Sequence, residues 1–184
     1  MKFIKILFFL VFLCACSNNE SSENTIKVGD KITLKSWDKQ EITLQRTQNG
    51  FKLLNSDKIL LIDIFGTFCP PCKAEAPALF ELQQAKKDSL IILGLSYAES
   101  VSDEKLKEFT QNYNAYYFLT NDKRADDIVE LIANDIKYTT QIQLPFKVMI
   151  KDGKYEKFNE SYFILGKADE GLLRSSINKI EEKK

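Results

Sequence analysis

A pair of cysteines two residues apart, Cys69 and Cys72, offers the chemistry that this sequence is best suited to perform. They follow an apolar run at residues 59–65 and stand at the start of residues 70–87, whose apolar spacing predicts a helix. The N-terminus of a helix presents free backbone N–H groups and a partial positive charge, which favour a thiolate at the first cysteine. The second cysteine lies one turn further on, close enough to resolve a mixed disulfide. The pattern therefore indicates a dithiol that opens and closes in redox chemistry.

The composition removes several other kinds of site. The chain has no histidine, so Ser-His-Asp and Cys-His nucleophile pairs are impossible, as are haem or copper sites that depend on imidazole. A zinc site would need two further nitrogen or sulfur ligands beside Cys69 and Cys72. We therefore expect no metal and no cofactor other than the disulfide itself. Lys plus Arg and Asp plus Glu are equal at 26 each, so no excess positive charge points to nucleic acid.

The N-terminus has the pattern of an export signal. Two lysines provide a positive start, and residues 6–13 form an apolar stretch that is too short to span a bilayer. The stretch ends in Leu-Cys-Ala-Cys at residues 13–16, which resembles a bacterial lipobox. Cys16 is the expected lipidation site because the small Ala15 precedes it, whereas Cys14 follows a bulky leucine. The alternative is an ordinary secretory leader with incidental cysteines.

The residues after this leader are polar up to residue 25 and suit a flexible tether between a membrane and a domain. We divide the chain into a signal peptide at residues 1–15, a tether at residues 16–27 and one domain at residues 28–184. A domain of this length can bury a sizeable core. With Cys16 carrying lipid, the exported domain keeps a single dithiol.

Strand-like and helix-like segments alternate along the domain. Apolar and polar residues alternate at residues 28–35 and 41–45, which predicts an N-terminal hairpin. Continuous apolar runs at residues 59–65 and 90–97 predict buried strands. Further strands are expected at residues 51–54, 115–119, 146–150 and 155–158, and helices at residues 70–87, 103–113, 124–135 and 169–179. The fold class is therefore α/β with a mixed sheet.

The segment at residues 65–77, Phe-Gly-Thr-Phe-Cys-Pro-Pro-Cys-Lys-Ala-Glu-Ala-Pro, resembles the signature of the membrane-tethered bacterial thiol-disulfide proteins of the TlpA/ResA/CcmG type. Pro77 and a late Leu144-Pro145, placed before a strand–Asp-Gly–strand hairpin, strengthen the match. The resemblance covers residues 28–181. It implies a thioredoxin fold, with a central mixed β-sheet flanked by helices and an N-terminal β-hairpin extension.

The resemblance assigns roles to the cysteines and to the late proline. Cys69 is the attacking nucleophile on the exposed side of the helix end, and Cys72 is the more buried resolving thiol. The alternative is a permanently closed disulfide or a pair of plain buried thiols. Pro145 corresponds to the cis-proline that faces the active-site pair, so Leu144 would offer its backbone N–H and C=O to an extended client. Leu144 is bulkier than the residue common there and gives a more apolar rim.

Two acids belong to the same expected site. Asp63 lies in an apolar strand, where a charged carboxylate is costly, and matches the buried aspartate of thioredoxin. Glu75 matches the glutamate that follows the second cysteine by three residues in TlpA/ResA-type proteins. A buried carboxyl beside a thiol should have a raised pKa and accept the proton of Cys72. The alternatives are an Asp63 that is salt-bridged, to Lys73 or another lysine, and a solvated Glu75 that matches the helix dipole.

The residues around the first cysteine indicate the direction of electron flow. Phe65 is expected in the core, whereas Phe68 is expected at the rim, where it meets the client together with Pro70 and Pro71. Neither proline has an N–H, so two donors to the Cys69 thiolate are lost, and no histidine lies between the cysteines. These features favour a reducing dithiol.

The resemblance also implies partners and a location. The clients would be protein thiols and disulfides, with the haem-binding cysteines of apocytochrome c as the family's best-known case. A membrane reductant of the DsbD or CcdA kind would recharge the dithiol, and the lipid at Cys16 would hold the domain on the periplasmic or other extracytoplasmic face of a membrane. The alternatives are a disulfide oxidase or isomerase, or a non-catalytic module that binds clients beside Pro145.

Overall fold

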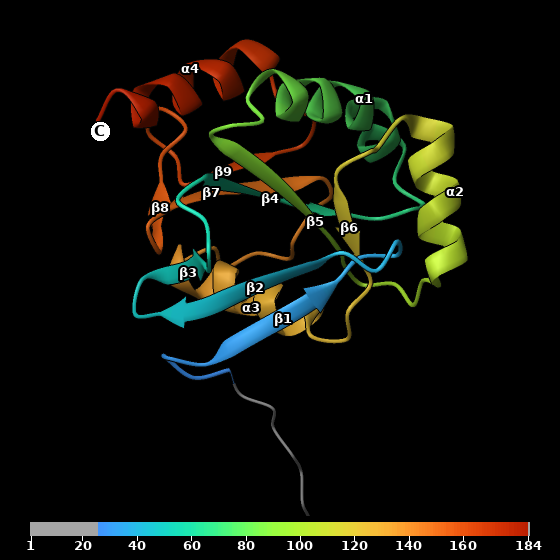
Figure 1. Cartoon of the computed structure of the whole chain (residues 1–184), viewed down its shortest axis with the longest axis horizontal. Helices are drawn as coiled ribbons and strands as arrows, with labels where there is room; N and C mark the ends of the chain where they lie inside the picture. The colour runs from blue at the N-terminus through green and yellow to red at the C-terminus, as the bar shows by residue number, and fades with distance from the viewer. Residues whose placement is uncertain (1–25, 184) are drawn as a thin grey trace, which may run out of the picture.

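A six-stranded mixed sheet lies at the centre of the computed structural model, which describes residues 26–183 (Figure 1). Its strands run in the order β6 (Phe118–Thr120), β5 (Leu90–Ser96), β4 (Ile59–Phe65), β7 (Phe146–Lys151) and β8 (Lys154–Glu156), and β9 (Phe163–Leu165) also pairs with β7. β4 is parallel to β5 and antiparallel to β7. The parallel pair requires a crossover connection, which a helix provides.

Three helices cover one face of this sheet (Figure 1). All seven residues of β4 are buried, and their side chains point alternately to the two faces. Leu61 and Phe65 pack in one core with α1 (Pro70–Ala85), α2 (Asp103–Tyr113) and α4 (Glu170–Glu181). Burial on both faces explains why this strand is a continuous apolar run.

The opposite face packs against α3 and a second, smaller sheet. Ile62 of β4 belongs to this second core, with apolar residues of α3 (Ala125–Asp135). The second sheet is antiparallel and consists of β1 (Lys31–Lys35), β2 (Glu41–Thr47) and β3 (Gly50–Leu53). A helix-flanked mixed sheet with an N-terminal antiparallel extension confirms the fold expected from the sequence.

Several element boundaries differ from those expected. The first strand begins at Lys31 rather than residue 28, because the Asp30 N–H bonds to the Lys27 carbonyl and closes a turn. The strand expected at residues 115–119 is the shorter β6, because the Ala115 N–H bonds to the end of α2 instead. β9 was not expected, since none of its three residues is fully buried and they show no apolar alternation.

The expected signal peptide and Cys16 lie outside the described residues. Within residues 26–183, no helix has the length and apolar character needed to cross a membrane.

Candidate active site

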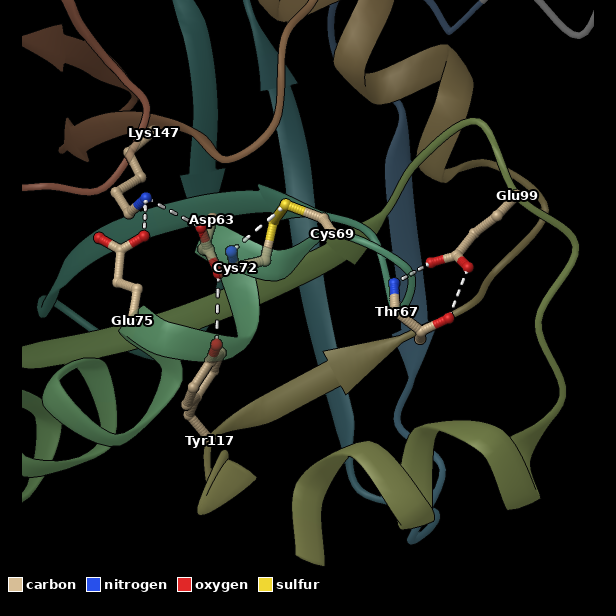
Figure 2. Close-up of a disulfide and its surroundings, with 8 residues drawn as sticks. All are labelled: Asp63, Thr67, Cys69, Cys72, Glu75, Glu99, Tyr117 and Lys147. Carbon is tan, nitrogen blue, oxygen red and sulfur yellow. Dashed lines mark hydrogen bonds and ion pairs between the residues drawn. A yellow bond between two sulfur atoms is a disulfide. The ribbon is translucent and has the colours of Figure 1, made fainter. Parts of the chain in front are cut away.

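A disulfide between Cys69 and Cys72 closes the first turn of α1, with an S–S distance of 2.07 Å (Figure 2). Cys69 is the N-cap residue of the helix, and its Sγ accepts a hydrogen bond from the Cys72 backbone N–H at 3.3 Å. Pro70 and Pro71 occupy the first two helical positions, where a missing N–H leaves no helical hydrogen bond unmade. The local sequence therefore starts the helix and places both sulfur atoms at its N-terminus.

The loop before Cys69 is a tight turn, in which the Gly66 carbonyl accepts a hydrogen bond from the Cys69 N–H at 3.1 Å. A Cβ atom at Gly66 would lie 2.8 Å from the Phe68 ring and 3.1 Å from a Leu144 methyl group, so these two side chains pack directly over the glycine and would have to shift to admit a larger residue. Phe68 is 60% exposed, whereas Phe65 is fully buried. The two aromatic residues thus lie at the rim and in the core, as expected.

The expected exposure of Cys69 is wrong for this oxidised state. Cys69 is 5% exposed and Cys72 is 4% exposed, so the two cysteines are equally buried. The reason is that the Sγ of Cys69 is bonded to Cys72 and also accepts the N–H of the first helical turn. Access to the disulfide is through a cavity of about 420 Å³.

The residues that line this cavity are mostly apolar, and none of those described carries a charge. Its lining comes from three separate segments and comprises Phe68, Cys69, Pro70, Pro71, Tyr97, Ala98, Gln141, Ile142 and Leu144. The Leu144–Pro145 peptide bond is cis, as the resemblance implies, although Pro145 itself is not among the lining residues. Four of the five residues expected to meet a client therefore surround the first cysteine.

A buried group of charged side chains lies between the sheet and α1, on the same face as the disulfide (Figure 2). Asp63 of β4 and Lys147 of β7 are directly opposite in the antiparallel register. The Lys147 Nζ lies 3.4 Å from Asp63 Oδ1 and 2.6 Å from Glu75 Oε2. Lys147 has no exposed surface, and the two acids are 2% exposed each. Asp63 is thus salt-bridged, with Lys147 rather than Lys73, and the solvated position considered for Glu75 is wrong.

Two neutral donors complete the surroundings of the carboxylates. The Tyr117 hydroxyl donates to Asp63 Oδ2 at 3.3 Å, and the Ala168 backbone N–H donates to Glu75 Oε1 at 2.9 Å. Burial raises the pKa of Glu75, Lys147 lowers it, and the negative charge of Asp63 raises it, with a net rise. Burial, together with the nearby Asp63 and Glu75, raises the pKa of Tyr117 well above its ordinary value, so its hydroxyl stays neutral.

The cluster is suited to holding one mobile proton. Two carboxyl groups and one ammonium group are electrically neutral together only when one carboxyl is protonated, and burial favours the neutral combination. Glu75 follows Cys72 by three residues on α1, and residues at this spacing face the same side of a helix. Asp63 points to the core that contains Cys72. Both carboxyl groups therefore lie on the side of the sheet and of α1 that holds Cys72.

Sequence reasoning did not single out three residues that contact this site. Lys147 could have been found as a lysine in the middle of an apolar strand. Tyr117 carries no distinguishing local signal. Glu99 accepts hydrogen bonds from Thr67 in the loop before Cys69, and this pairing is visible only in the fold. Within the described chain, no group of three or more His, Cys, Asp or Glu side chains is arranged to hold a metal ion.

Residues 41–140, more than half of the chain, match the family model described as Thioredoxin. The chain belongs to the thioredoxin family. The members of this family are thiol-disulfide oxidoreductases that act on protein thiols and disulfides, and the Cys69–Cys72 pair has the Cys-x-x-Cys spacing of their redox centre.

Several bacterial proteins are similar to this thioredoxin-family chain. The thioredoxin-like protein YneN of Bacillus subtilis is 24% identical over 131 residues, which cover 64% of this chain and 75% of YneN. StoA of Bacillus subtilis has a solved structure with a TM-score of 0.56 and 16% identity, covering 81% of this chain and 97% of that one. A secreted disulfide oxidoreductase of Mycobacterium tuberculosis has a solved structure with a TM-score of 0.52 and 16% identity, and the match covers 80% of this chain and 95% of that one. The structural matches show a shared fold.

Proposed function

We propose that this protein is an extracytoplasmic reductase of protein disulfides. The observation that carries the proposal is the disulfide at the N-terminus of α1, set beside a buried carboxyl pair and reached through an uncharged cavity. Each feature has a function in thiol–disulfide exchange: the helix end stabilises a thiolate, the carboxyls move a proton, and the cavity receives a client.

The reaction begins with the reduced dithiol. The Cys69 thiolate attacks one sulfur of a client disulfide, which forms a mixed disulfide and releases the other client sulfur as a thiolate. Cys72 then gives its proton to the carboxyl pair, and its thiolate attacks the Cys69 sulfur of the mixed disulfide. The client leaves with both sulfurs reduced, and the protein keeps the Cys69–Cys72 disulfide. A reducing partner must supply two electrons to begin the next cycle.

The buried cluster supplies the base for the second step. Glu75 and Asp63 share the single cation of Lys147, so the carboxyl pair becomes electrically neutral with the lysine when it takes up one proton. The raised pKa of Glu75 brings it closer to the range in which a general base works at neutral pH. The Tyr117 hydroxyl keeps Asp63 oriented by donating to its second oxygen.

The reducing direction is supported by the first turn of α1. Pro70 and Pro71 have no N–H, so the Cys72 N–H is the first of this turn that can reach the Cys69 sulfur. A weakly stabilised thiolate favours the disulfide form, which makes the dithiol a reductant.

The proposed surroundings of the protein follow the resemblance. Lipid at Cys16 would hold the domain on the outer side of a bacterial membrane, and one relative is described as secreted. A membrane reductant of the DsbD or CcdA kind would return electrons to the Cys69–Cys72 disulfide. Apocytochrome c, which presents two cysteines that must be reduced before haem attachment, is the proposed client class.

The reduction potential of the purified full chain, equilibrated in glutathione or dithiothreitol buffers, tests this function. We expect a value at or below about −220 mV, in the span from glutaredoxins to thioredoxin. A value above about −180 mV, toward that of DsbA, would contradict the reductase and favour a disulfide oxidase or isomerase.

A trapping experiment separates catalysis from simple binding. Cys72→Ser should accumulate a mixed disulfide with a peptide disulfide, because the resolving thiol is missing, whereas Cys69→Ser should form none. Equal client binding by all variants without any mixed disulfide would instead favour a non-catalytic binding module.

A further inference from the structure

Glu99 lies in the loop after β5 and accepts hydrogen bonds from the loop that leads to Cys69 (Figure 2). One carboxylate oxygen accepts the Thr67 backbone N–H at 2.6 Å, and the other accepts the Thr67 hydroxyl at 2.7 Å. The Ser96 hydroxyl also donates to Glu99, at 3.2 Å. Hydrogen bonds to an ionised carboxylate are stronger than those between neutral groups, so three such bonds hold this side chain firmly.

Thr67 is the second residue of the turn that runs from Gly66 to Cys69. The Gly66 carbonyl and the Cys69 N–H close this turn, and Phe68 is its third residue. Glu99 holds both the backbone and the side chain of Thr67, and the tilt of the turn is thereby fixed. The direction of the Phe68 ring at the rim depends on that tilt.

The loop that carries Glu99 also forms part of the cavity over the disulfide. Tyr97 and Ala98 line this cavity, together with Phe68 and Leu144 from the other two segments. Ala98 has a φ of +56°, a left-handed conformation that is uncommon for alanine and costs free energy. Its N–H bonds to Asp126 at 3.3 Å. The surrounding contacts therefore hold this loop in a conformation that it would not adopt alone.

We propose that Glu99 is a positioning residue that sets the width of the client cavity by tying two of its three walls together. One wall is the turn with Phe68, and the other is the loop with Tyr97 and Ala98. Glu99 touches neither sulfur atom nor the carboxyl cluster, so it governs how a client binds rather than the thiol chemistry. The inference rests on the proposed function, since it requires a client that enters this cavity.

The test compares two substrates with the full-length protein. A peptide disulfide whose cysteines are flanked by apolar residues fills the cavity, whereas 2-hydroxyethyl disulfide is too small to contact both walls. We expect Glu99→Ala to raise the KM for the peptide about tenfold, because the peptide binds about tenfold more weakly. The kcat for the peptide and the exchange rate with the small disulfide should stay within about twofold of the wild-type values, which is small beside a tenfold change in KM.

Conservative variants distinguish the positioning role of Glu99 from a general loss of folding. In Glu99→Gln the amide oxygen can accept the Thr67 N–H and the amide nitrogen can donate to the Thr67 hydroxyl oxygen, so the KM should return close to that of the wild type. Thr67→Val keeps the shape and loses only the hydroxyl bond, so it should raise the KM less than Glu99→Ala does, and Thr67→Ser should not raise it. Glu104→Ala, at an exposed glutamate of α2, is the matched control.

The outcomes separate the two proposals. An unchanged peptide KM in Glu99→Ala would overturn the positioning role while leaving the reductase intact. An equal fall in the exchange rate with the peptide and with the small disulfide would do the same. A wild-type protein that exchanges with neither disulfide would overturn the proposed function and this inference with it.

Discussion

Lys147 is a lysine with no exposed surface whose ammonium group lies between two carboxylates. Removing such a residue affects its partners as much as itself, because a nearby positive charge favours the ionised form of a carboxyl group. At the scale of single residues, Lys147 therefore governs how readily Glu75 can act as the proposed proton acceptor for Cys72. Lys147 contacts the two carboxylates and acts on the exchange only through them, so it is a positioning residue.

We expect Lys147→Met to shift the acid limb of the pH profile for dithiol oxidation to higher pH. Without the cation, the pKa of Glu75 rises further, so a larger fraction is protonated and unable to accept a proton at a given pH. The shift should be about 1–3 pH units, the usual effect of losing one adjacent opposite charge. Stopped-flow oxidation of the reduced protein by a small disulfide, followed across pH, measures it.

Two further variants make this pH experiment decisive. Lys154→Met, at an exposed lysine of β8, should leave the profile unchanged. Asp63→Asn combined with Lys147→Met removes one negative and one positive charge. It therefore tests the shift in the pH profile in a core whose net charge has not changed. An unaltered midpoint in Lys147→Met would show that the lysine has only a packing role.

At the scale of elements, Glu75 connects three parts of the fold that are remote in sequence. It belongs to α1, pairs with Lys147 of β7 and accepts the N–H of Ala168, just before α4 begins. Glu75 lies in the second turn of α1, where a carboxyl group would ordinarily face solvent. Here the packing of α4 and β7 over the helix turns it into a buried crosslink, whose protonation is coupled to folding.

The stability of the oxidised protein should therefore decrease as the pH rises above the ordinary pKa of a glutamate. The pKa of Glu75 is raised above 4.5 by burial, so the folded state holds its proton more tightly than the unfolded chain does. This contribution to the free energy of unfolding is fully present below pH 4.5 and is lost as the pH rises through the higher pKa of the folded state. Urea unfolding at a series of pH values, with Glu75→Gln as the comparison, measures the effect.

In Glu75→Gln this component of the pH dependence should be missing, so the variant gains stability relative to the wild type as the pH rises. Glu81→Gln, at an exposed glutamate of the same helix, provides the control. Parallel stability curves for the wild type and Glu75→Gln would contradict the prediction.

At the scale of the whole molecule, a buried ion pair joins the N-terminal sheet to the rest of the protein. Arg46 of β2 contacts both carboxylate oxygens of Asp135 at the end of α3, at 2.5 and 2.7 Å. The Tyr155 hydroxyl of β8 also donates to Asp135, at 2.9 Å. Because the N-terminal sheet shares an apolar core with α3 and the central sheet, we expect the whole domain to unfold as one unit.

Asp135→Ala should lower the free energy of unfolding by about 2–4 kcal/mol, because it leaves the Arg46 guanidinium without its counter-charge in a largely buried site. The expected loss is below that of a fully enclosed pair, since Asp135 lines a surface cavity. Urea unfolding measures it, with Glu130→Ala on the exposed side of α3 as the control. The double variant Arg46→Met with Asp135→Leu should lose less than the single one, and an equal or larger loss would argue against this account.

The sequence by itself determined the features that depend on near neighbours. The continuous apolar run predicted β4 at its observed bounds, and the apolar spacing after Cys69 predicted a helix that begins at residue 70. Ser102 caps the next helix by accepting a hydrogen bond from the Lys105 N–H, and a serine just before a helix is a signal of the same local kind. Each of these signals acts within a few residues, because hydrophobic periodicity, proline geometry and capping are local effects.

Only the tertiary structure decided which side chains meet at the site. Asp63 finds Lys147 through the register of two antiparallel strands, and Thr67 finds Glu99 at 32 residues' distance along the chain. The burial of Cys69 likewise results from the closed disulfide and its place on α1, which no local pattern reveals. A sequence shows that a buried charge needs a partner, but the partner is chosen by strand order and register, which the packing of the whole chain sets.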